Sequence, residues 1–422
     1  MSQEPRVDRD VEIEGEPFAL VVTTHHEGPT VARTAIHRQN FARRIGGARF
    51  VPRPADADGD YGLAEVGRLS CAMTEKSLAA MIPADGQKSV LVTTPEIVDD
   101  AERKVRILTE HIRAVAAIDP GVIFGPDMNV PEEIQNRASH VDGLLDHVTG
   151  LSIADGGLSI DHRGYTAEGL VEGIAACVPE GRLRGMTATV QGFGAVGAHA
   201  ARRLHERGVR VRAVSNALGM IFALDETGLD ADGLFRAWQT GGDEAVRAFV
   251  TETGGRAAWS DDPDALFSIP CDIFVPAART LVLAMPDQLE RVRGTENKNV
   301  QDVTVFFERT GARIVAEGAN GPLTNEAERW LEERGVLVLP DYIVNCGGLI
   351  GCWVEWEERH AGGRPAGDQL EVMHGRALER VRQTVRENVR ELMRARPTFR
   401  DLASRAVDRN REKLEPVPPP ER

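Results

Sequence analysis

Cysteine is scarce in this sequence, and its histidines are not clustered. Only 5 cysteines occur among 422 residues, and they form neither a C-x-x-C pair nor a metal-ligand spacing. The 11 histidines are scattered and include no H-E-x-x-H motif. We therefore predict reduced thiols, no disulfide framework and no metal site.

Long hydrophobic runs and an excess of basic residues are also missing. No stretch approaches the roughly 20 apolar residues that span a bilayer, and the opening M-S-Q-E-P-R-V-D-R-D lacks the basic-then-apolar order of a signal peptide. The net charge of −15 disfavours binding to nucleic acid or to an anionic membrane. We expect a cytoplasmic protein with neither partner, and 422 residues are enough for two domains.

The most informative stretch is 187–197, which reads T-A-T-V-Q-G-F-G-A-V-G. An apolar run long enough for one buried strand precedes the glycines, and a helical segment follows them. In this context the first glycine permits a tight turn, the second lets backbone N–H groups approach a pyrophosphate, and the third lets helix and strand pack closely. The helix N-terminus adds a partial positive charge. The sequence predicts a dinucleotide site formed by Gly192, Phe193, Gly194, Ala195, Val196 and Gly197.

The residue expected to bind the ribose hydroxyls departs from the usual pattern. A second strand is predicted at 209–214, and an acidic residue normally follows it, but Asn216 stands there instead. A missing carboxylate removes the usual repulsion of a 2′-phosphate. NAD and NADP are therefore both possible cofactors.

Two domains are predicted from the order of elements. Strands and helices alternate from 167 to 340, which indicates an α/β protein with a doubly wound, Rossmann-type nucleotide-binding domain. The earlier part mixes strands with helices, including one continuous helix expected at 95–117, and indicates an α+β domain. We place the nucleotide-binding domain at 149–345, and the second domain at 1–148 with returning helices at 346–422.

Several short motifs occur in a characteristic order. They are M-T-E-K, D-G-Q-K, G-P-D, G-F-G-A-V-G, E-G-A-N-G-P and P-D-Y-I-V-N-C-G-G, spread over about 34–356. In combination they resemble the glutamate/leucine/phenylalanine/valine dehydrogenase family, and the segment 36–49 looks like the opening of its leucine and phenylalanine enzymes. The resemblance implies reversible NAD(P)-dependent conversion of an L-amino acid to a 2-oxo acid and ammonia. It also implies a homo-oligomer assembled through the α+β domain, with an active site in the cleft between the domains.

The resemblance assigns roles to individual residues. Lys88 and Asp127 match the catalytic lysine and aspartate, and Lys76 matches the lysine that binds the substrate α-carboxylate. A lysine desolvated beside another cation has a lowered pKa and can act as a general base, while a nearby carboxylate can carry protons to and from the nitrogen. Further residues implied at the cofactor are Thr166, Ala277, Asn320 and Asn345.

Substrate choice depends on a few pocket positions. In the glutamate enzymes a lysine precedes the G-G-x-R pair, and a serine lies in the helix after N-A-G-G; here Ile45 and Cys352 occupy these positions. A buried substrate carboxylate would then be unpaired. The phenylalanine enzymes are similar to this chain at Gly125 and Leu349, and a glycine widens the pocket. We predict an apolar, aromatic substrate, with branched-chain substrates and glutamate as alternatives; Gly46 and Gly47 complete the predicted substrate site.

Three departures from the family pattern leave an alternative function open. Asp85 and Gln87 replace glycines before Lys88, and Asn129 replaces the glycine two residues after Asp127. Each substitution changes a loop or strand next to a predicted catalytic residue. A nucleotide-binding or regulatory protein that no longer turns over is therefore the alternative outside enzyme chemistry.

Overall fold

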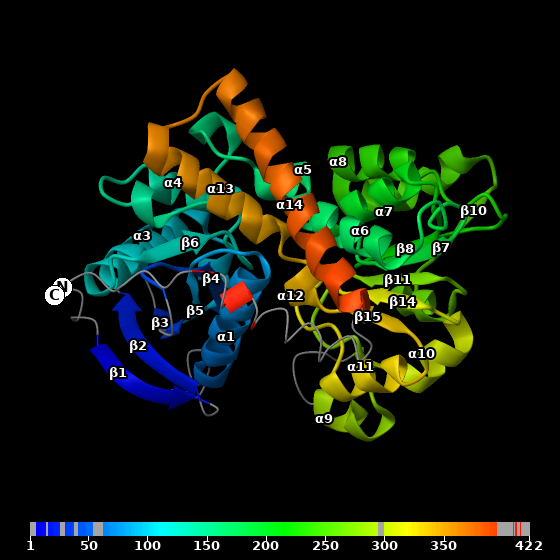
Figure 1. The fold of residues 1–422 in the computed structure, drawn as a ribbon, viewed down its shortest axis with the longest axis horizontal. Helices are drawn as coiled ribbons and strands as arrows, with labels where there is room; N and C mark the ends of the chain where they lie inside the picture. The colour runs from blue at the N-terminus through cyan, green and yellow to red at the C-terminus, as the bar shows by residue number, and fades with distance from the viewer. Residues whose placement is uncertain are drawn as a thin grey trace. The chain divides into compact units, whose positions relative to one another are not determined.

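The computed structural model describes residues 6–13, 16–25, 30–37, 41–53, 62–293 and 299–394, together with positions 408, 410, 411 and 414. The chain divides into two compact units, coloured along the chain in Figure 1. Unit 1 contains the described residues of Met1–Arg163, Leu349–Glu379 and Val407–Arg422, and unit 2 contains those of Gly164–Gly348 and Arg380–Ala406.

Unit 1 is built on a six-stranded sheet of order β1-β2-β3-β5-β4-β6. The first strands are antiparallel to their neighbours, whereas β4 runs parallel to both β5 and β6. In parallel strands, paired residues point to the same face of the sheet. The strands are β1 (Arg6–Ile13), β2 (Glu16–His25), β3 (Thr30–His37), β4 (Arg44–Pro52), β5 (Asp85–Thr93) and β6 (Val122–Gly125).

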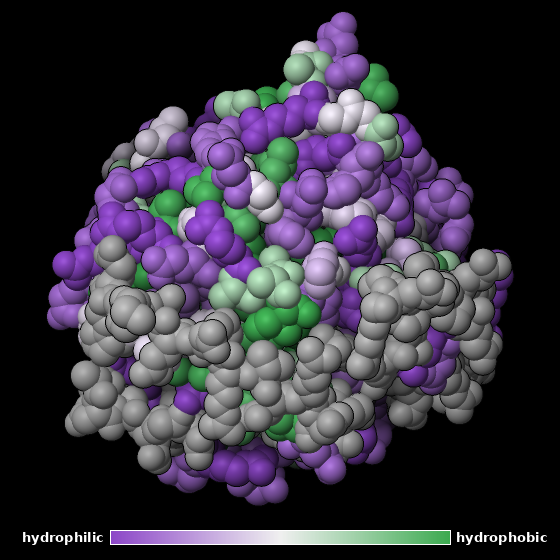
Figure 2. Space-filling view, turned by 90° about the vertical axis from the view of Figure 1, so that its left-hand side faces the viewer, coloured by the Kyte–Doolittle hydropathy of each residue, from purple (hydrophilic) through white to green (hydrophobic). Residues whose placement is uncertain are grey.

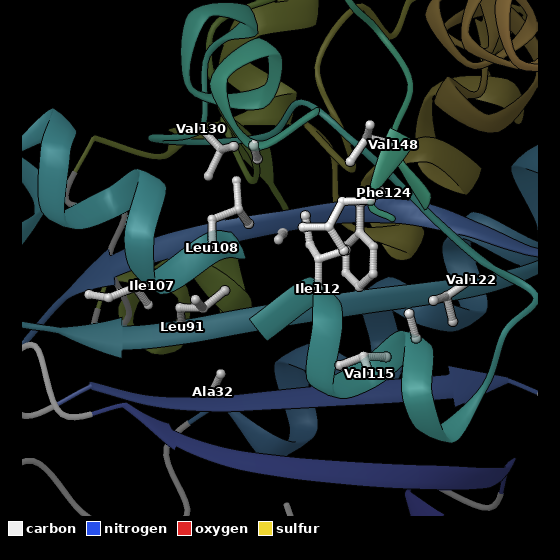
Figure 3. Close-up of a cluster of buried hydrophobic side chains, with 14 of the residues drawn as sticks. Ala32, Leu91, Ile107, Leu108, Ile112, Val115, Val122, Phe124, Val130 and Val148 are labelled. Atoms are coloured by element: carbon white, nitrogen blue, oxygen red, sulfur yellow. The ribbon is translucent and has the colours of Figure 1, made fainter. Parts of the chain in front are cut away.

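Helices cover both faces of this sheet, because successive apolar side chains of β5 point to opposite faces and both need a partner. Val90 packs in one cluster with Val66 of α1 (Leu63–Ala79), whereas its neighbour Leu91 packs in another with α3 (Ala101–Ile118). Figure 3 shows the second cluster, in which Ile112 of α3 lies against Phe124 of β6. The remaining α-helices of this unit include α2 (Pro95–Val98), α4 (Glu132–Ser139) and α5 (Ile160–Arg163).

The helix predicted at 95–117 is in fact two helices. The chain leaves α2 after Val98, and α3 begins only after Asp100, whose side chain accepts a hydrogen bond from the backbone N–H of Arg103 at 3.0 Å. Such an N-cap satisfies a helix-start donor and makes a new helix favourable at that point. The apolar periodicity is similar on both sides, so it concealed the break.

Unit 2 contains the predicted parallel sheet, in the order β10-β9-β8-β7-β11-β14-β15. The strands β8, β7, β11, β14 and β15 are parallel to one another, and β9 and β10 extend the sheet antiparallel at one edge, which the sequence did not predict. The strands are β7 (Thr187–Gln191), β8 (Arg210–Asn216), β9 (Gly219–Ala223), β10 (Ala257–Ser260), β11 (Ile273–Pro276), β14 (Ile314–Ala316) and β15 (Leu337–Leu339). Its helices include α6 (Tyr165–Cys177), α7 (Ala195–Glu206), α8 (Ala231–Ala248), α10 (Val303–Thr310), α11 (Asn325–Glu332) and α12 (Asp341–Val344).

The boundary predicted at residue 149 differs from the division seen in the structure. Residues 149–163 belong to unit 1 because the carboxylate of Glu355 in α13 (Gly347–Gly362) accepts hydrogen bonds from the backbone N–H groups of Leu151 and Leu158. These contacts join residues that are 204 and 197 positions apart in sequence. Local pattern carries no signal for them.

The C-terminal part of the long helix α14 (Asp368–Arg394) likewise belongs to unit 2 rather than to the first domain. Its Arg382 contacts Glu168 at 2.6 Å, and its Arg386 contacts Glu172 at 3.1 Å. Both glutamates lie on α6 and are almost fully buried. Buried carboxylates require charged partners, so these pairs hold this part of the helix against α6.

The surface agrees with the polar composition. In the face drawn in Figure 2, hydrophilic residues cover most of the coloured area, and apolar side chains emerge in limited areas between them. Among the helices of the described residues, none is both long and apolar enough to cross a membrane.

Candidate active site

Two of the predicted catalytic residues are in direct contact. Lys88 lies on β5, Asp127 follows β6, and the Lys88 Nζ is 2.5 Å from the Asp127 Oδ2. Both side chains are close to 90% buried, at 9% and 12% relative exposure. The position of Asp127 is fixed by a tight loop, in which its backbone N–H and C=O both hydrogen-bond to Val130, at 3.2 and 2.8 Å.

Arg49 also contacts this pair, and the sequence reasoning missed it. Its Nε–H donates to Oδ2 of Asp127 and its Nη2–H donates to Oδ1, each at 3.2 Å. The signal was present in the G-G-x-R motif, because Arg49 lies two residues after Gly47 on β4 and so points to the same face.

The charges in this cluster shift the pKa of both predicted catalytic groups. Burial lowers the pKa of Lys88, and the positive charges of Arg49 and Lys76 add to this effect, while Asp127 opposes it. Burial alone would raise the pKa of Asp127, but the charges of Lys88 and Arg49 outweigh it and hold that pKa well below its usual range. A lysine with a lowered pKa beside a carboxylate that stays ionised is suited to general-base chemistry.

The predicted substrate lysine and the glycine pair lie next to this cluster. Lys76 is on the last turns of α1 and is 8% exposed. A Cβ at Gly46 would lie 1.7 Å from the carbonyl oxygen of Gln87, and a Cβ at Gly47 would lie 2.8 Å from Cβ of Asp127. Glycine is therefore required at both positions for β4 to approach β5 and the loop 127–130 that carries Asp127, which we call the catalytic loop.

The three departures from the family pattern are accommodated in the structure. Asp85 turns away from Lys88 and accepts a hydrogen bond from the backbone N–H of Phe41 at 2.8 Å. The Nδ2 of Asn129 donates to the Phe50 carbonyl at 2.8 Å, and Asn129 takes a φ of 61°, a left-handed conformation that asparagine tolerates better than most residues. Gln87 donates to the Ile123 carbonyl at 3.1 Å.

Two of the predicted side-chain pocket residues, Gly125 and Cys352, lie next to each other. A Cβ at Gly125 would lie 3.9 Å from Sγ of Cys352 and from Cγ2 of Thr149, which is ordinary van der Waals contact. Ile45 is fully buried on the same face of β4 as Gly47, and half-buried Leu349 lies one turn before Cys352 on α13. Burial raises the pKa of the Cys352 thiol well above its usual range, so this residue is neutral.

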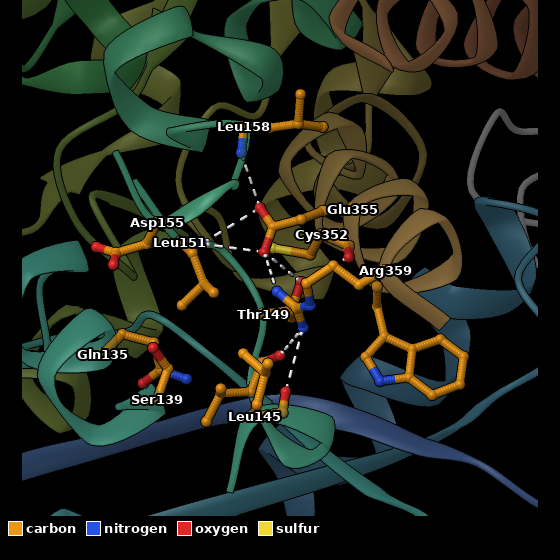
Figure 4. Close-up of polar contacts among 12 residues, drawn as sticks. Gln135, Ser139, Leu145, Thr149, Leu151, Asp155, Leu158, Cys352, Glu355 and Arg359 are labelled. Atoms are coloured by element: carbon orange, nitrogen blue, oxygen red, sulfur yellow. Dashed lines mark hydrogen bonds and ion pairs between the residues drawn. The ribbon is translucent and has the colours of Figure 1, made fainter. Parts of the chain in front are cut away.

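A buried ion pair holds the pocket segment of α13. Glu355 contacts Arg359 at 2.9 Å and accepts the backbone N–H of Leu158, also at 2.9 Å, as Figure 4 shows. Arg359 in turn donates to the carbonyl of Val148, and Thr149 donates to the carbonyl of Cys352 at 2.6 Å. These contacts join the strand-end loop around Thr149 to the helix that carries Cys352. The sequence offered no signal that distinguished Glu355 from a solvent-exposed glutamate.

The glycine-rich turn in unit 2 has the form that a dinucleotide requires. It connects β7 to α7; Gly192 has a φ of 91°, and a Cβ at Gly197 would lie 1.8 Å from the Gly192 carbonyl oxygen. A Cβ at Gly194 would meet nothing within 4 Å, so backbone here borders open space. The first turn of α7 has no side-chain cap, which leaves backbone N–H groups for a phosphate.

The other predicted cofactor residues gather at the carboxyl ends of the parallel strands. Ala277 follows β11 and would touch a Cβ at Gly318 at 3.0 Å, and Nδ2 of Asn345 donates to the Gly318 carbonyl. A Cβ at Gly347 would lie 2.1 Å from the carbonyl oxygen of Tyr165, the residue before half-buried Thr166. Asn320 is exposed. Ligands of doubly wound sheets bind at this edge.

Asn216 ends β8, the strand beside β7, as expected for a ribose-binding position. Its Oδ1 accepts the backbone N–H of Leu218 at 2.9 Å, and its Nδ2 donates to the carbonyl of Asp243 at 3.3 Å. Among the residues that the structure describes, no group of three or more His, Cys, Asp or Glu could hold a metal ion.

Comparison with known proteins agrees with this architecture. The sequence model of the Glutamate/Leucine/Phenylalanine/Valine dehydrogenase family matches residues 156–400, more than half of the chain. The chain belongs to this family. The predictions of family, of dehydrogenase class and of a nicotinamide cofactor are thereby confirmed.

Relatives within the dehydrogenase family differ in substrate. Glutamate dehydrogenase of Aeropyrum pernix is 30% identical over 85% of this chain and 77% of its own length. L-tryptophan dehydrogenase of Nostoc punctiforme is 29% identical over 79% of this chain and 79% of its own length. The crystal structure of hetero-hexameric glutamate dehydrogenase from Thermus thermophilus, in its Leu-bound form, has a TM-score of 0.69 at 23% identity and covers 97% of this chain and 88% of its own. This last likeness supports the fold alone.

Proposed function

We propose that this protein catalyses the reversible NAD(P)-dependent oxidative deamination of an apolar, preferably aromatic, L-amino acid to the 2-oxo acid and ammonia. The observation that carries the proposal is the buried contact of 2.5 Å between Lys88 and Asp127. A further charged residue, Lys76, is near enough to lower the pKa of Lys88 through its charge. Family membership supplies the reaction class.

In this proposal each residue of the cluster has one role. Lys76 binds the substrate α-carboxylate as a charged hydrogen-bond donor. Lys88, whose pKa is lowered, takes a proton from the water that hydrolyses the imine. Asp127 accepts a hydrogen bond from the substrate nitrogen and carries its proton to and from Lys88. A bound nicotinamide cofactor would supply the acceptor for the hydride that leaves Cα.

The nucleotide is proposed to bind unit 2. Backbone N–H groups at Gly194 and in the first turn of α7 would hold the pyrophosphate, and Asn216 would lie at the adenosine ribose. Thr166, Asn320 and Asn345 are proposed near the nicotinamide. An asparagine neither repels a 2′-phosphate nor pairs with it, so both NAD and NADP remain in the proposal.

The apolar substrate is supported by the residues around Gly125. Ile45 is fully buried where the glutamate enzymes have a lysine, and the Cys352 thiol stays neutral. Neither residue can pair with a substrate carboxylate, whose burial alone costs several kcal/mol or more. The missing side chain at Gly125 leaves the room of one methyl group beside Cys352, which favours a larger substrate side chain, and a tryptophan dehydrogenase is among the relatives.

Glutamate is the second candidate substrate. The observation in its favour is that glutamate dehydrogenases stand among the relatives, at up to 30% identity. It would require a cation other than residue 45 to pair with the side-chain carboxylate. Branched-chain substrates need no such partner and are the remaining alternative.

Assembly and location are also proposals. Family membership is the basis for an oligomer, because the resemblance to this family implies one. We propose a homo-oligomer acting in the cytoplasm, assembled through unit 1.

The direct test is a substrate panel. Purified protein is mixed with NAD⁺ or NADP⁺ and each of the common L-amino acids at mildly alkaline pH, and reduced cofactor is followed by absorbance at 340 nm. We expect activity with phenylalanine, tryptophan or tyrosine. Activity confined to leucine and valine, or to glutamate, would overturn the pocket argument but keep the catalytic pair. No activity, with cofactor binding intact, would favour the non-catalytic alternative.

A further inference from the structure

We propose that Arg49 is a positioning residue that aims the Asp127 carboxylate at Lys88 through paired hydrogen bonds from one guanidinium. This inference rests on the proposed function, and it adds a residue that neither the predicted roles nor the comparisons assign. The paired donation to both carboxylate oxygens, each at 3.2 Å, is its basis.

The contacts of Asp127 leave its carboxylate a single orientation. Oδ1 accepts from Nη2 of Arg49 and from the backbone N–H of Met128 at 2.8 Å, while Oδ2 accepts from Nε of Arg49 and contacts Nζ of Lys88 at 2.5 Å. Two parallel donors from one planar group fix the plane of a carboxylate, which a single ammonium cannot do. Lys88 alone would hold Asp127 by one oxygen only.

Arg49 is itself anchored from the opposite side. Its Nη1 donates to Oε1 of Glu65 on α1 at 3.1 Å, and the guanidinium is 13% exposed. Four alternating charges therefore run from α1 through β4 to the catalytic loop and β5: Glu65, Arg49, Asp127 and Lys88. Lys76 of α1 is the further charged group that acts on Lys88.

Charge and geometry can be separated by two substitutions. Arg49→Lys keeps a positive charge but loses the paired donors. We expect kcat to fall about 100-fold because the Asp127 carboxylate is no longer held in its orientation toward Lys88. The acidic limb of the pH profile should stay where it is, and KM for the amino acid should change little because Lys76 binds its carboxylate. Arg49→Met also removes the charge that helps to lower the pKa of Lys88, so its acidic limb should move to higher pH.

The experiment measures kcat, KM and pH profiles of wild type and both variants, with cofactor binding and thermal unfolding as checks of folding. Arg103→Lys and Arg103→Met are the matched controls, because Arg103 forms an exposed pair with Asp100 at 3.3 Å. They should leave every parameter unchanged. A kcat within about threefold of wild type in folded Arg49→Lys would contradict the positioning role. The role would also be contradicted if kcat fell equally in both variants, in proportion to their loss of thermal stability, and the acidic limb of the pH profile did not move.

A second readout does not depend on turnover. The pH dependence of trace acetylation of Lys88 by acetic anhydride, followed by peptide mass spectrometry, reports the pKa of this amine. The pKa of Lys88 should be higher in Arg49→Met than in wild type and unchanged in Arg49→Lys. An inactive wild type would refute the proposed function, whereas unchanged acetylation in Arg49→Met would refute the electrostatic action of Arg49 by itself.

Discussion

Gly47 and Asp127 are in such close contact that a Cβ at residue 47 would lie 2.8 Å from Cβ of Asp127 and 2.9 Å from its Oδ2. Gly47→Ala should therefore displace the carboxylate from Lys88. Since a misplacement of about 1 Å can reduce a rate about 100-fold, we expect a loss of this order in kcat. Steady-state kinetics checks it.

The control for this substitution is Gly375→Ala. A Cβ at Gly375, in α14, would meet nothing within 4 Å, so this change should leave kcat unaltered. Alanine is also the better helix former, by roughly 1 kcal/mol, so stability should not fall. Full activity of Gly47→Ala would show that the catalytic loop can move aside without harm.

Gly125→Ala should change substrate preference without affecting folding. Its Cβ would lie at an ordinary contact distance of 3.9 Å from Cys352, so the backbone need not shift. One added methyl in an apolar pocket commonly changes discrimination by about 10-fold or more. We expect kcat/KM for phenylalanine or tryptophan to fall relative to leucine by this factor. An unchanged ratio would mean that the side chain binds elsewhere.

Buried His111 should make the protein sensitive to mild acid. Its ring lies between the hydroxyls of Thr23, Thr34 and Ser89, at 2.9–3.1 Å. Burial, together with the charge of His25, lowers the pKa of His111 to about 3, whereas the unfolded chain titrates near about 6.5. Between these values only the unfolded state takes up the proton, so the free energy of unfolding falls as pH falls, by at most about 1.4 kcal/mol per pH unit.

The check is denaturant unfolding at several pH values. His111→Gln cannot take up a proton and should flatten the dependence between pH of about 6.5 and about 4. His140→Gln is the control, since His140 is exposed and pairs with Asp155 at 2.5 Å. An equal pH dependence in wild type and His111→Gln would remove His111 from the explanation.

Glu355→Gln should destabilise the protein strongly. The substitution leaves the buried guanidinium of Arg359 without its charge partner and turns an amide toward backbone N–H donors. Breaking a buried pair in this way costs about 3–5 kcal/mol. Glu206→Gln, in the exposed Arg202–Glu206 pair at 3.1 Å, should cost less than about 0.5 kcal/mol. Similar losses in the two variants, measured by urea unfolding, would contradict this account.

The parts of the structure that the sequence predicted well are those that local pattern determines. The strand–turn–helix from β7 to α7 was readable because Gly192 and Gly197 meet steric demands within a few residues of each other. The contact of Lys88 with Asp127 was predictable only through resemblance. No local rule brings β5 and the end of β6 to either side of β4.

What the sequence did not reveal depends on long-range packing. Arg49, Glu355 and Arg382 each resemble an ordinary surface charge until their partners are known, at separations of 78, 204 and 214 residues. The boundaries of the two units were not predictable for the same reason, because they depend on such long-range contacts. Charged residues are usually exposed, so pattern alone assigns such side chains to the surface.

The most direct test of the central claim, that Lys88 is the general base of an amino-acid dehydrogenase, is the turnover of Lys88→Ala with the best substrate of the panel. General-base removal should reduce kcat by about 10²–10⁴-fold. Lys88 lies in unit 1, so the Kd for the nucleotide, measured by calorimetry, should stay unchanged. Turnover within about tenfold of wild type in a folded Lys88→Ala protein would contradict the account.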